Sequence, residues 1–272
     1  MINRRQFFHY GKVAALAGMA TTLPSAWQQW AAQTPPGSGN GANNTNSLSV
    51  QWLGHTCFLF EGEGQRVLVN PFRPIGCTAG YPPPLVSADL VLISSRLLDE
   101  GYTDGLPGQP RLLFEPGSYQ FRNKSIQGIR THHDRYGGRR FGINVAWSWT
   151  QAGVNILHLG GAAAPINSEQ RILMGRPDLL LLPVGGGPKA YTPAEAKEAM
   201  RLLNPKVVIP MHYRTTAADA EICDLVEVDE FVSVLDNRVV ETVNANSIQL
   251  TTGSLPETGP VIKVMSYQTL TG

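Results

Sequence analysis

From residue 48 onward the chain consists of short apolar runs separated by turn-forming residues. Runs of this length are typical of β-strands, because the buried face of a helix needs a longer periodic pattern. We therefore expect strands at 49–53, 57–60, 66–69, 89–94, 111–114, 125–131, 144–149, 155–159, 179–184 and 207–211. The first three should form a meander, with the sequence EGEG at 61–64 as its second turn. The 28 glycines and 20 prolines agree with a chain that turns often.

The later part of the chain alternates strands with helices. Thr192 can cap a helix and Glu195 can complete its capping box, so we expect a helix from there to about Leu203. Two weaker helix candidates lie at 167–174 and 217–225. Antiparallel strands followed by alternating strands and helices favour two sheets packed face to face with helices outside.

The N-terminal region has the pattern of a targeting peptide. Arg4 and Arg5 are followed by the sequence QFF and then by a modest apolar stretch. The adjacent arginines resemble a twin-arginine translocation signal, and the alternative is a short amphipathic helix. We therefore divide the chain into a signal peptide or anchor at 1–32, a flexible linker at 33–47 and one domain at 48–272. Twin-arginine export would place the domain in the periplasm or an equivalent extracytoplasmic lumen, tethered to the membrane if the leader is not cleaved.

The charge balance excludes one class of partner. Lys and Arg number 22 against 21 Asp and Glu, which gives a net charge of +1. Nucleic-acid binding needs a basic surface that displaces counterions, so we expect no nucleic-acid partner. The three cysteines, Cys57, Cys77 and Cys223, are irregularly spaced and predict neither a disulfide framework nor a CxxC metal clip.

Five segments stand in an order that one family shares. They are WLGHTCF at 52–58, LVNPF at 68–72, ILHLG at 156–160, LPVGG at 182–186 and VIPMHYRT at 208–215. Together they resemble the metallo-β-lactamase fold superfamily, and within it the branch of ascorbate-6-phosphate lactonase-like Zn-dependent hydrolases. The resemblance implies an α+β fold of four layers, an αββα sandwich, in which loops at one sheet edge hold two metal ions.

The first metal-binding loop that the resemblance implies has changed in this chain. The family carries an HxHxDH motif directly after an apolar strand, and here that place is taken by SRLLDE. Ser95, Leu97 and Glu100 stand in place of the three histidines, and Asp99 alone is retained. We interpret the motif as degenerate.

Two further ligand positions match the family and one does not. His133 and His212 match its later histidines, whereas Gly161 stands where a bridging aspartate is expected. Zn²⁺ needs about four N, S or O donors, and without the bridging carboxylate nothing holds two ions together. The resemblance thus implies at most one remnant metal site, with the candidate ligands Asp99, Glu100, His133 and His212. We expect no cofactor or one divalent ion, Zn or Mn, and two carboxylates favour oxygen-preferring metals.

Other conspicuous residues have structural interpretations. His55 and His158 lie at strand positions, where a histidine hydrogen-bonded to the backbone is the commoner case. Five arginines could form an anion-binding rim, or only a solvated charged surface: Arg130, Arg135, Arg139, Arg140 and Arg214. The sequence has no GxSxG, P-loop or GxGxxG motif that would indicate other chemistries.

Two classes of function remain open. The first is a non-catalytic family member, an accessory protein that binds another protein or a small anionic ligand. The second is a hydrolase with one metal ion, acting on an ester, a lactone or a phosphoester. The altered loop favours the first class, because a leucine at a ligand position offers a metal no donor atom. Membrane contact is expected only through the leader.

Overall fold

The computed structural model describes residues 46–236 and 238–267. The predicted signal peptide and most of the predicted linker lie outside the described residues. Among the helices that are described, none is long and apolar enough to cross a membrane.

The first sheet, called sheet A here, has six strands in the order β13-β1-β2-β3-β4-β5. Its members are β1 (Leu48–Gly54), β2 (Cys57–Gly62), β3 (Gln65–Val69), β4 (Leu90–Leu92), β5 (Arg111–Leu113) and β13 (Ser247–Leu250). The pairs β1–β2 and β2–β3 are antiparallel, which confirms the predicted meander. Strands β3, β4 and β5 are parallel, and β4 is buried along its whole length, as its continuous apolar sequence predicts.

The second sheet, sheet B, has eight strands in the order β12-β14-β11-β10-β9-β8-β7-β6. They are β6 (Gly117–Phe121), β7 (Lys124–His132), β8 (Ile143–Gln151), β9 (Val154–His158), β10 (Leu179–Pro183), β11 (Val207–Met211), β12 (Val239–Val243) and β14 (Val261–Met265). Strands β6 to β9 form an antiparallel meander, and β9 to β12 run parallel across the sheet.

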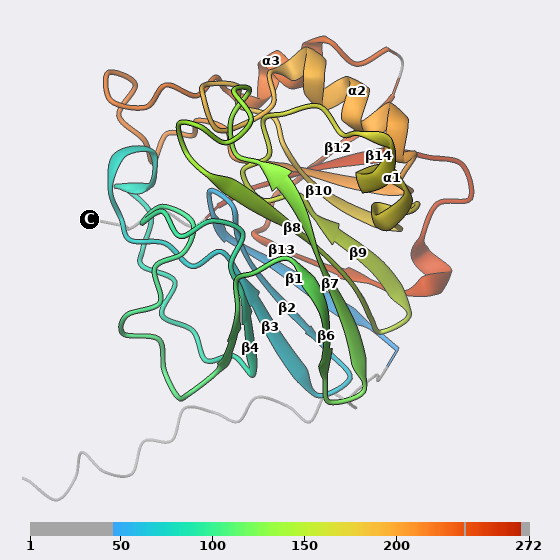
Figure 1. The fold of residues 1–272 in the computed structure, drawn as a ribbon. Coiled ribbons are helices and arrows are strands. Elements are labelled where there is room, and N and C mark those ends of the chain that lie inside the picture. Colours follow the sequence, from blue (N-terminus) through green and yellow to red (C-terminus); the bar gives the residue numbers. More distant parts are fainter. Residues whose placement is uncertain (1–45, 237, 268–272) are drawn as a thin grey trace, which may run out of the picture. The chain divides into compact units, whose positions relative to one another are not determined.

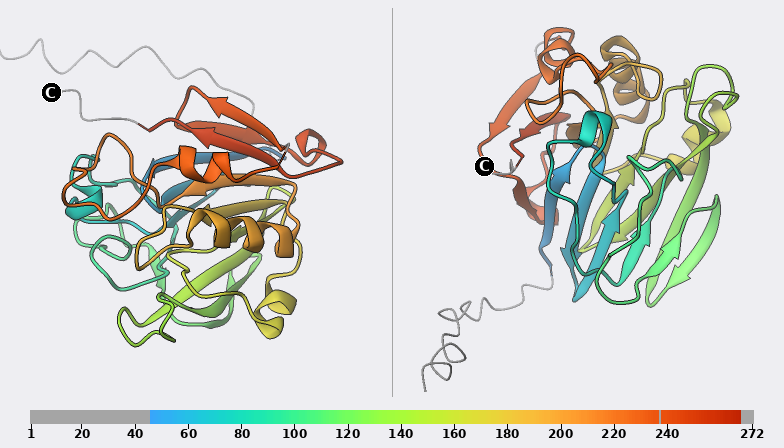
Figure 2. Two further views of the ribbon diagram at one scale, coloured as in Figure 1. Left: turned by 90° about the horizontal axis from the view of Figure 1, so that it is seen from above. Right: turned by 90° about the vertical axis from the view of Figure 1, so that its left-hand side faces the viewer.

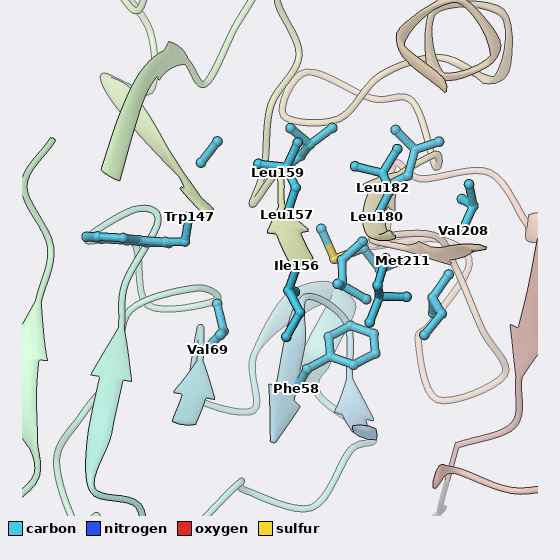
Figure 3. Close-up of a cluster of buried hydrophobic side chains, with 14 of the residues drawn as sticks. Phe58, Val69, Trp147, Ile156, Leu157, Leu159, Leu180, Leu182, Val208 and Met211 are labelled. Carbon is cyan, nitrogen blue, oxygen red and sulfur yellow. The ribbon is translucent and has the colours of Figure 1, made fainter. Parts of the chain in front are cut away.

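One hydrophobic core joins the inner faces of the two sheets (Figures 1 and 3). Phe58 and Val69 of sheet A and Trp147 and Ile156 of sheet B belong to the same buried cluster. Burying a side chain of this size stabilises the fold by roughly 1.5–3 kcal/mol. The predicted α+β sandwich is confirmed.

The three α-helices are α1 (Ser168–Met174), α2 (Pro193–Leu203) and α3 (Val228–Ser233), and two short 3-10 helices are η1 (Gly76–Thr78) and η2 (Thr252–Ser254). Helix α2 begins as predicted: the Thr192 side chain accepts a hydrogen bond from the Glu195 N–H, and the Glu195 carboxylate accepts one from the Thr192 N–H. Helices α1 and α2 pack against β7 and β10 of sheet B. Figure 2 shows α2 and α3 together on that side of the molecule.

The outer face of sheet A is covered by loops in the described part of the chain, so the helical layer that the resemblance implies on this side is not formed there. Phe72, Tyr81 and Val86, from the segment between β3 and β4, pack on Leu59 and Leu68 of that face. The sequence explains why no α-helix forms there. Proline lacks the backbone N–H that an α-helix interior needs, and three consecutive prolines stand at 82–84.

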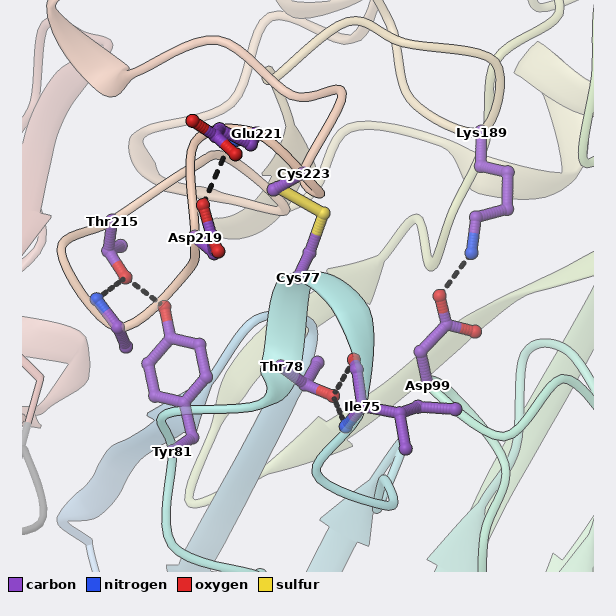
Figure 4. Close-up of a disulfide and its surroundings, with 11 residues drawn as sticks. Ile75, Cys77, Thr78, Tyr81, Asp99, Lys189, Thr215, Asp219, Glu221 and Cys223 are labelled. Carbon is purple, nitrogen blue, oxygen red and sulfur yellow. Dashed lines mark hydrogen bonds and ion pairs between the residues drawn. A yellow bond between two sulfur atoms is a disulfide. The ribbon is translucent and has the colours of Figure 1, made fainter.

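A disulfide joins two loops that the sequence analysis left unconnected. Cys77 in η1 is bonded to Cys223, 146 residues further along the chain (Figure 4). The weak helix prediction at 217–225 is wrong, because this segment folds as successive turns around the bonded cysteine. The same two loops are also joined by a 2.6 Å hydrogen bond between the Tyr81 and Thr215 hydroxyls.

We expect the disulfide to stabilise the domain. A crosslink over 146 residues restricts the unfolded chain, and removal of such a bond typically costs about 2–5 kcal/mol. Reductant should lower the melting temperature of the wild-type protein to that of the Cys77→Ser/Cys223→Ser variant, and should leave the variant unchanged. A wild-type melt that does not respond to reductant would contradict this prediction.

Candidate metal centre

Four buried ionisable side chains meet where loops from both sheets come together. Three of them directly follow a strand: His55 follows β1, His133 follows β7 and His212 follows β11. The fourth lies in the loop after β4. We call this set the His–Glu cluster, and each of its side chains is at most 1% exposed: His55, Glu100, His133 and His212.

The glutamate lies at the centre of the His–Glu cluster. Glu100 Oε2 is 3.1 Å from His133 Nε2, and Glu100 Oε1 is 3.7 Å from His212 Nδ1. The His55 and His212 rings have centroids 4.3 Å apart. Ligating atoms of His55, Glu100 and His212 all lie within 4.8 Å of one another, so one cation could contact all three side chains.

These polar atoms lack partners. Both ring nitrogens of His55 and of His133, both Glu100 oxygens and His212 Nδ1 have no hydrogen-bond partner within the described residues. The 3.1 Å approach of His133 to Glu100 provides electrostatic attraction but lacks hydrogen-bond alignment. Each unsatisfied buried group costs about 1–3 kcal/mol, and more when it is charged. The chemistry of the donor set therefore fits a bound divalent cation.

The histidine protonation states also suit metal binding. Burial lowers the pKa of His55 to about 4, and it lowers the pKa of His212 well below its ordinary value. Burial would also lower the pKa of His133, but the Glu100 carboxylate outweighs it, so this pKa is raised. His55 and His212 are thus neutral at pH 7, which is the form that binds a metal.

The backbone holds His55 and His212 in an uncommon conformation. Both residues have φ +54, in the left-handed region that non-glycine residues seldom adopt. The His212 N–H donates to the His55 carbonyl at 3.3 Å and ties the two loops together. A Cβ at Gly185 would lie 2.7 Å from the Tyr213 Cα and closer still to the His212 carbonyl oxygen. The loop after β10 is therefore packed directly against the backbone of His212. Such strain concentrates at functional sites.

Two buried polar side chains brace the loops from sheet B. Asn144 donates to the Thr131 hydroxyl at 2.7 Å and to the Leu159 carbonyl at 2.8 Å, and its Oδ1 accepts from the Gly161 N–H at 2.9 Å. Asp134, directly after His133, accepts four backbone N–H groups of the loop that follows it. Desolvation would raise the pKa of Asp134, but these four hydrogen bonds outweigh it and bring the pKa to about 2.

Three of the four predicted ligands lie together, and the fourth is paired elsewhere. Glu100, His133 and His212 belong to the His–Glu cluster. Asp99 lies beside it and forms an ion pair with Lys189 (Figure 4). Desolvation would raise the pKa of Asp99, but the Lys189 ammonium holds it below its ordinary value.

His55 belongs to the His–Glu cluster, although it is not among the candidate ligands expected from the sequence. The predicted backbone hydrogen bond to its ring is not formed. The signal that could have identified it is its place directly after a strand, which it shares with His133 and His212. The same prediction for His158 is confirmed: its Nδ1 accepts from the Gly160 N–H at 3.1 Å, so its Nε2 donates to the Thr56 carbonyl at 3.0 Å.

Three of the five arginines considered as an anion-binding rim or a solvated charged surface have partners of their own. Arg135 donates to both Glu195 carboxylate oxygens and to two backbone carbonyls, which is a structural role. Arg214 pairs with Glu227. Arg140 stacks on the ring of Phe141, 4.8 Å from its centroid. For the remaining Arg130 and Arg139, no salt bridge forms with any residue in the described ranges.

Comparison with known proteins identifies the class of protein to which this fold and site belong. Residues 49–212 match a family model described as the beta-lactamase superfamily domain. The chain belongs to the metallo-β-lactamase superfamily.

Several relatives are named as metal-dependent or Zn-dependent hydrolases. The solved structure of a proposed Zn-dependent hydrolase of this superfamily from Thermotoga maritima is 31% identical with a TM-score of 0.64, covering 80% of this chain and 98% of that one. A protein of Thermoplasma acidophilum, named a metal-dependent hydrolase, is 28% identical over 62% of this chain and 84% of its own length. Another of that name, from Methanoculleus marisnigri, is 26% identical over 78% of this chain and 98% of its own.

We expect the cluster to hold one metal ion rather than two. Elemental analysis after dialysis should find no more than about one Zn²⁺ or Mn²⁺ per chain. At a hundredfold excess over the dissociation constant, the ion should stabilise the fold by about 2.7 kcal/mol in thermal melts. His55→Ala and His212→Ala should each lower the affinity at least about tenfold, because each removes a donor.

The matched control is His132→Ala, which changes the half-buried neighbour of His133 outside the cluster. Asp99→Asn tests whether Asp99, which pairs with Lys189, also binds the metal ion. A loss of metal affinity as large as that of His212→Ala would show that Asp99 is a ligand. About two zinc ions per chain would contradict the prediction, and so would a wild-type melt unaffected by metal.

Proposed function

We propose that the protein is a single-metal hydrolase acting on an ester, a lactone or a phosphoester. The observation that carries this proposal is the convergence of His55, Glu100 and His212, buried and without partners for the atoms that would ligate. Two histidines and one glutamate are the protein ligands of a class of catalytic zinc sites, which leave one coordination position open. Because this set has two histidines and one carboxylate, where the set expected from the sequence has two of each, it favours zinc over oxygen-preferring metals.

The residues around the ion would have separate tasks. His55, Glu100 and His212 would bind it, and a bound divalent ion would act as a Lewis acid on the scissile group. His133 lies against Glu100 and would orient its carboxylate. Lys189 is ion-paired with Asp99 and lies 6.0 Å from the centroid of the Phe141 ring. A small anionic substrate or ligand would bind beside the cluster by sharing the Lys189 ammonium with Asp99.

A second candidate function is a non-catalytic accessory protein that uses the same ion for stability. The observation that favours it is the near-complete burial of all four cluster side chains, since a hydrolase must admit its substrate. Structural metal sites are closed in this way, whereas catalytic sites keep an open position. Both candidates require the ion, so a test of activity in the metal-loaded protein separates them.

The metal-loaded protein should hydrolyse at least one of p-nitrophenyl acetate, a simple lactone and bis-p-nitrophenyl phosphate. Glu100→Gln keeps the shape of the side chain and removes its charge. We expect kcat/KM to fall at least about a hundredfold, because changes in residues that only support a metal ligand typically lower activity by about 10–100-fold. Glu115→Gln, the same change at an exposed residue, should behave as wild type. A stably metal-bound protein with no activity on the three substrates would favour the accessory role.

We also propose that the domain is exported by the twin-arginine route. The pair of arginines at positions 4 and 5, followed by QFF, supports this proposal. The Cys77–Cys223 disulfide supports it independently, because disulfides persist mainly in oxidising compartments outside the cytoplasm.

Export should depend on the geometry of both arginines as well as on their charge. The double change Arg4→Lys/Arg5→Lys keeps two positive charges but removes the planar guanidinium groups. We expect the variant to accumulate in the cytoplasm, measured by cell fractionation. Lys12→Arg is the control and should be exported normally. Normal export of the double variant would exclude the twin-arginine route.

A further inference from the structure

Glu100 and Gly161 lie against each other although they belong to different sheets. Glu100 follows β4 of sheet A, and Gly161 follows β9 of sheet B. A Cβ placed on Gly161 would lie 2.5 Å from Glu100 Oε1 and 2.9 Å from Oε2, and it would be closer still to the Cε1 atom of His133. These separations are far inside van der Waals contact. Any side chain at position 161 would therefore compete with the Glu100 carboxylate for the same space.

Space, and not backbone conformation, is what requires a glycine here. Gly161 does not have a positive φ, so an L-residue could adopt its backbone conformation. Its N–H is held at 2.9 Å by Asn144, whose side chain is buried and anchored at two other points. The backbone at 161 cannot easily withdraw, and a side chain there would have to displace Glu100 and His133.

The position of the Glu100 carboxylate is also the one a metal ligand needs. Its two oxygens face different histidines, His133 on one side and His212 on the other, and neither oxygen has a hydrogen-bond donor in the described structure. His133 is the nearest ring to a Glu100 oxygen among the described residues, at 3.1 Å, and a buried carboxylate without an aligned donor is stabilised by a bound cation.

We propose that Glu100 supplies the metal-binding carboxylate from the loop after β4, in the space that a side chain at 161 would fill, and that Gly161 is the positioning residue that leaves this space free. This inference rests on the proposed function in one respect, that the His–Glu cluster binds a divalent ion. It adds that the carboxylate and the glycine form one coupled pair.

The first test adds a methyl group and removes no ligand. Gly161→Ala should lower the affinity for Zn²⁺ at least tenfold in isothermal titration, because the methyl displaces Glu100 and His133. The matched control is Gly253→Ala, since a Cβ at Gly253 meets no atom within 4 Å and its φ is not positive. Wild-type affinity in a folded Gly161→Ala protein would overturn the inference.

The second test moves the carboxylate from one sheet to the other. Glu100→Ala should lose Zn²⁺ affinity, and the exchange Glu100→Ala/Gly161→Asp should recover at least tenfold of it. Gly161→Asp alone should bind worse than wild type, because two carboxylates then occupy the same space. An exchange variant that binds no better than Glu100→Ala would refute the proposal that the two positions share one carboxylate site.

A third measurement separates failure of the inference from failure of the proposed function. The measurement is a thermal melt in the presence of a chelator. Gly161→Ala should lower the melting temperature more when Glu100 is present than in the Glu100→Ala background. A wild-type protein that binds no metal would overturn the proposed function and the metal role of Glu100 together. Metal binding by wild type without coupling between the two positions would overturn the inference alone.

Discussion

Burial of four ionisable side chains between the loops of two sheets is the constraint on which the rest of the site depends. Withdrawing a carboxylate and three imidazoles from water is unfavourable, and an orphaned buried charge costs far more than a neutral group. The fold keeps them together through fixed backbone: Asn144 braces two segments, the loop after β10 presses on His212, and Asp134 organises the loop after His133. The sandwich supplies rigid strand ends, and the strand ends hold the donors in place.

Much of the fold could be predicted from the sequence because strand signals are local. Short apolar runs between turns correctly located the meander and the buried parallel strands. Strands β6, β12, β13 and β14 were missed because their residues are largely half-buried or exposed, so they lack a continuous buried apolar run. The predicted helix at 217–225 failed for a different reason. The segment forms turns around Cys223, which is bonded to Cys77, and no local pattern reports a bond to a residue 146 positions away.

The site could be predicted only in part, because its side-chain contacts, like the disulfide, join residues that are far apart in the chain. Family resemblance marked Glu100, His133 and His212, whose proximity the structure then supplied. His55 was misread because the satisfaction of a histidine ring depends on distant neighbours, which a strand pattern does not contain. Asp99 was a reasonable candidate from its motif, but its partner Lys189 lies 90 residues away in the chain. Local periodicity indicates which backbone forms, whereas side-chain pairing is settled by the tertiary fold.

The close approach of position 161 to the Glu100 carboxylate has a consequence for the order in which substitutions are tolerated. Because a side chain at 161 and the Glu100 carboxylate would occupy the same space, an acid at 161 is accommodated only after Glu100 has been replaced by a smaller residue. The reverse order passes through an overpacked, doubly acidic intermediate. The two positions are therefore coupled by volume, and only one of them can carry a carboxylate without overpacking the site. This is epistasis that follows from packing alone.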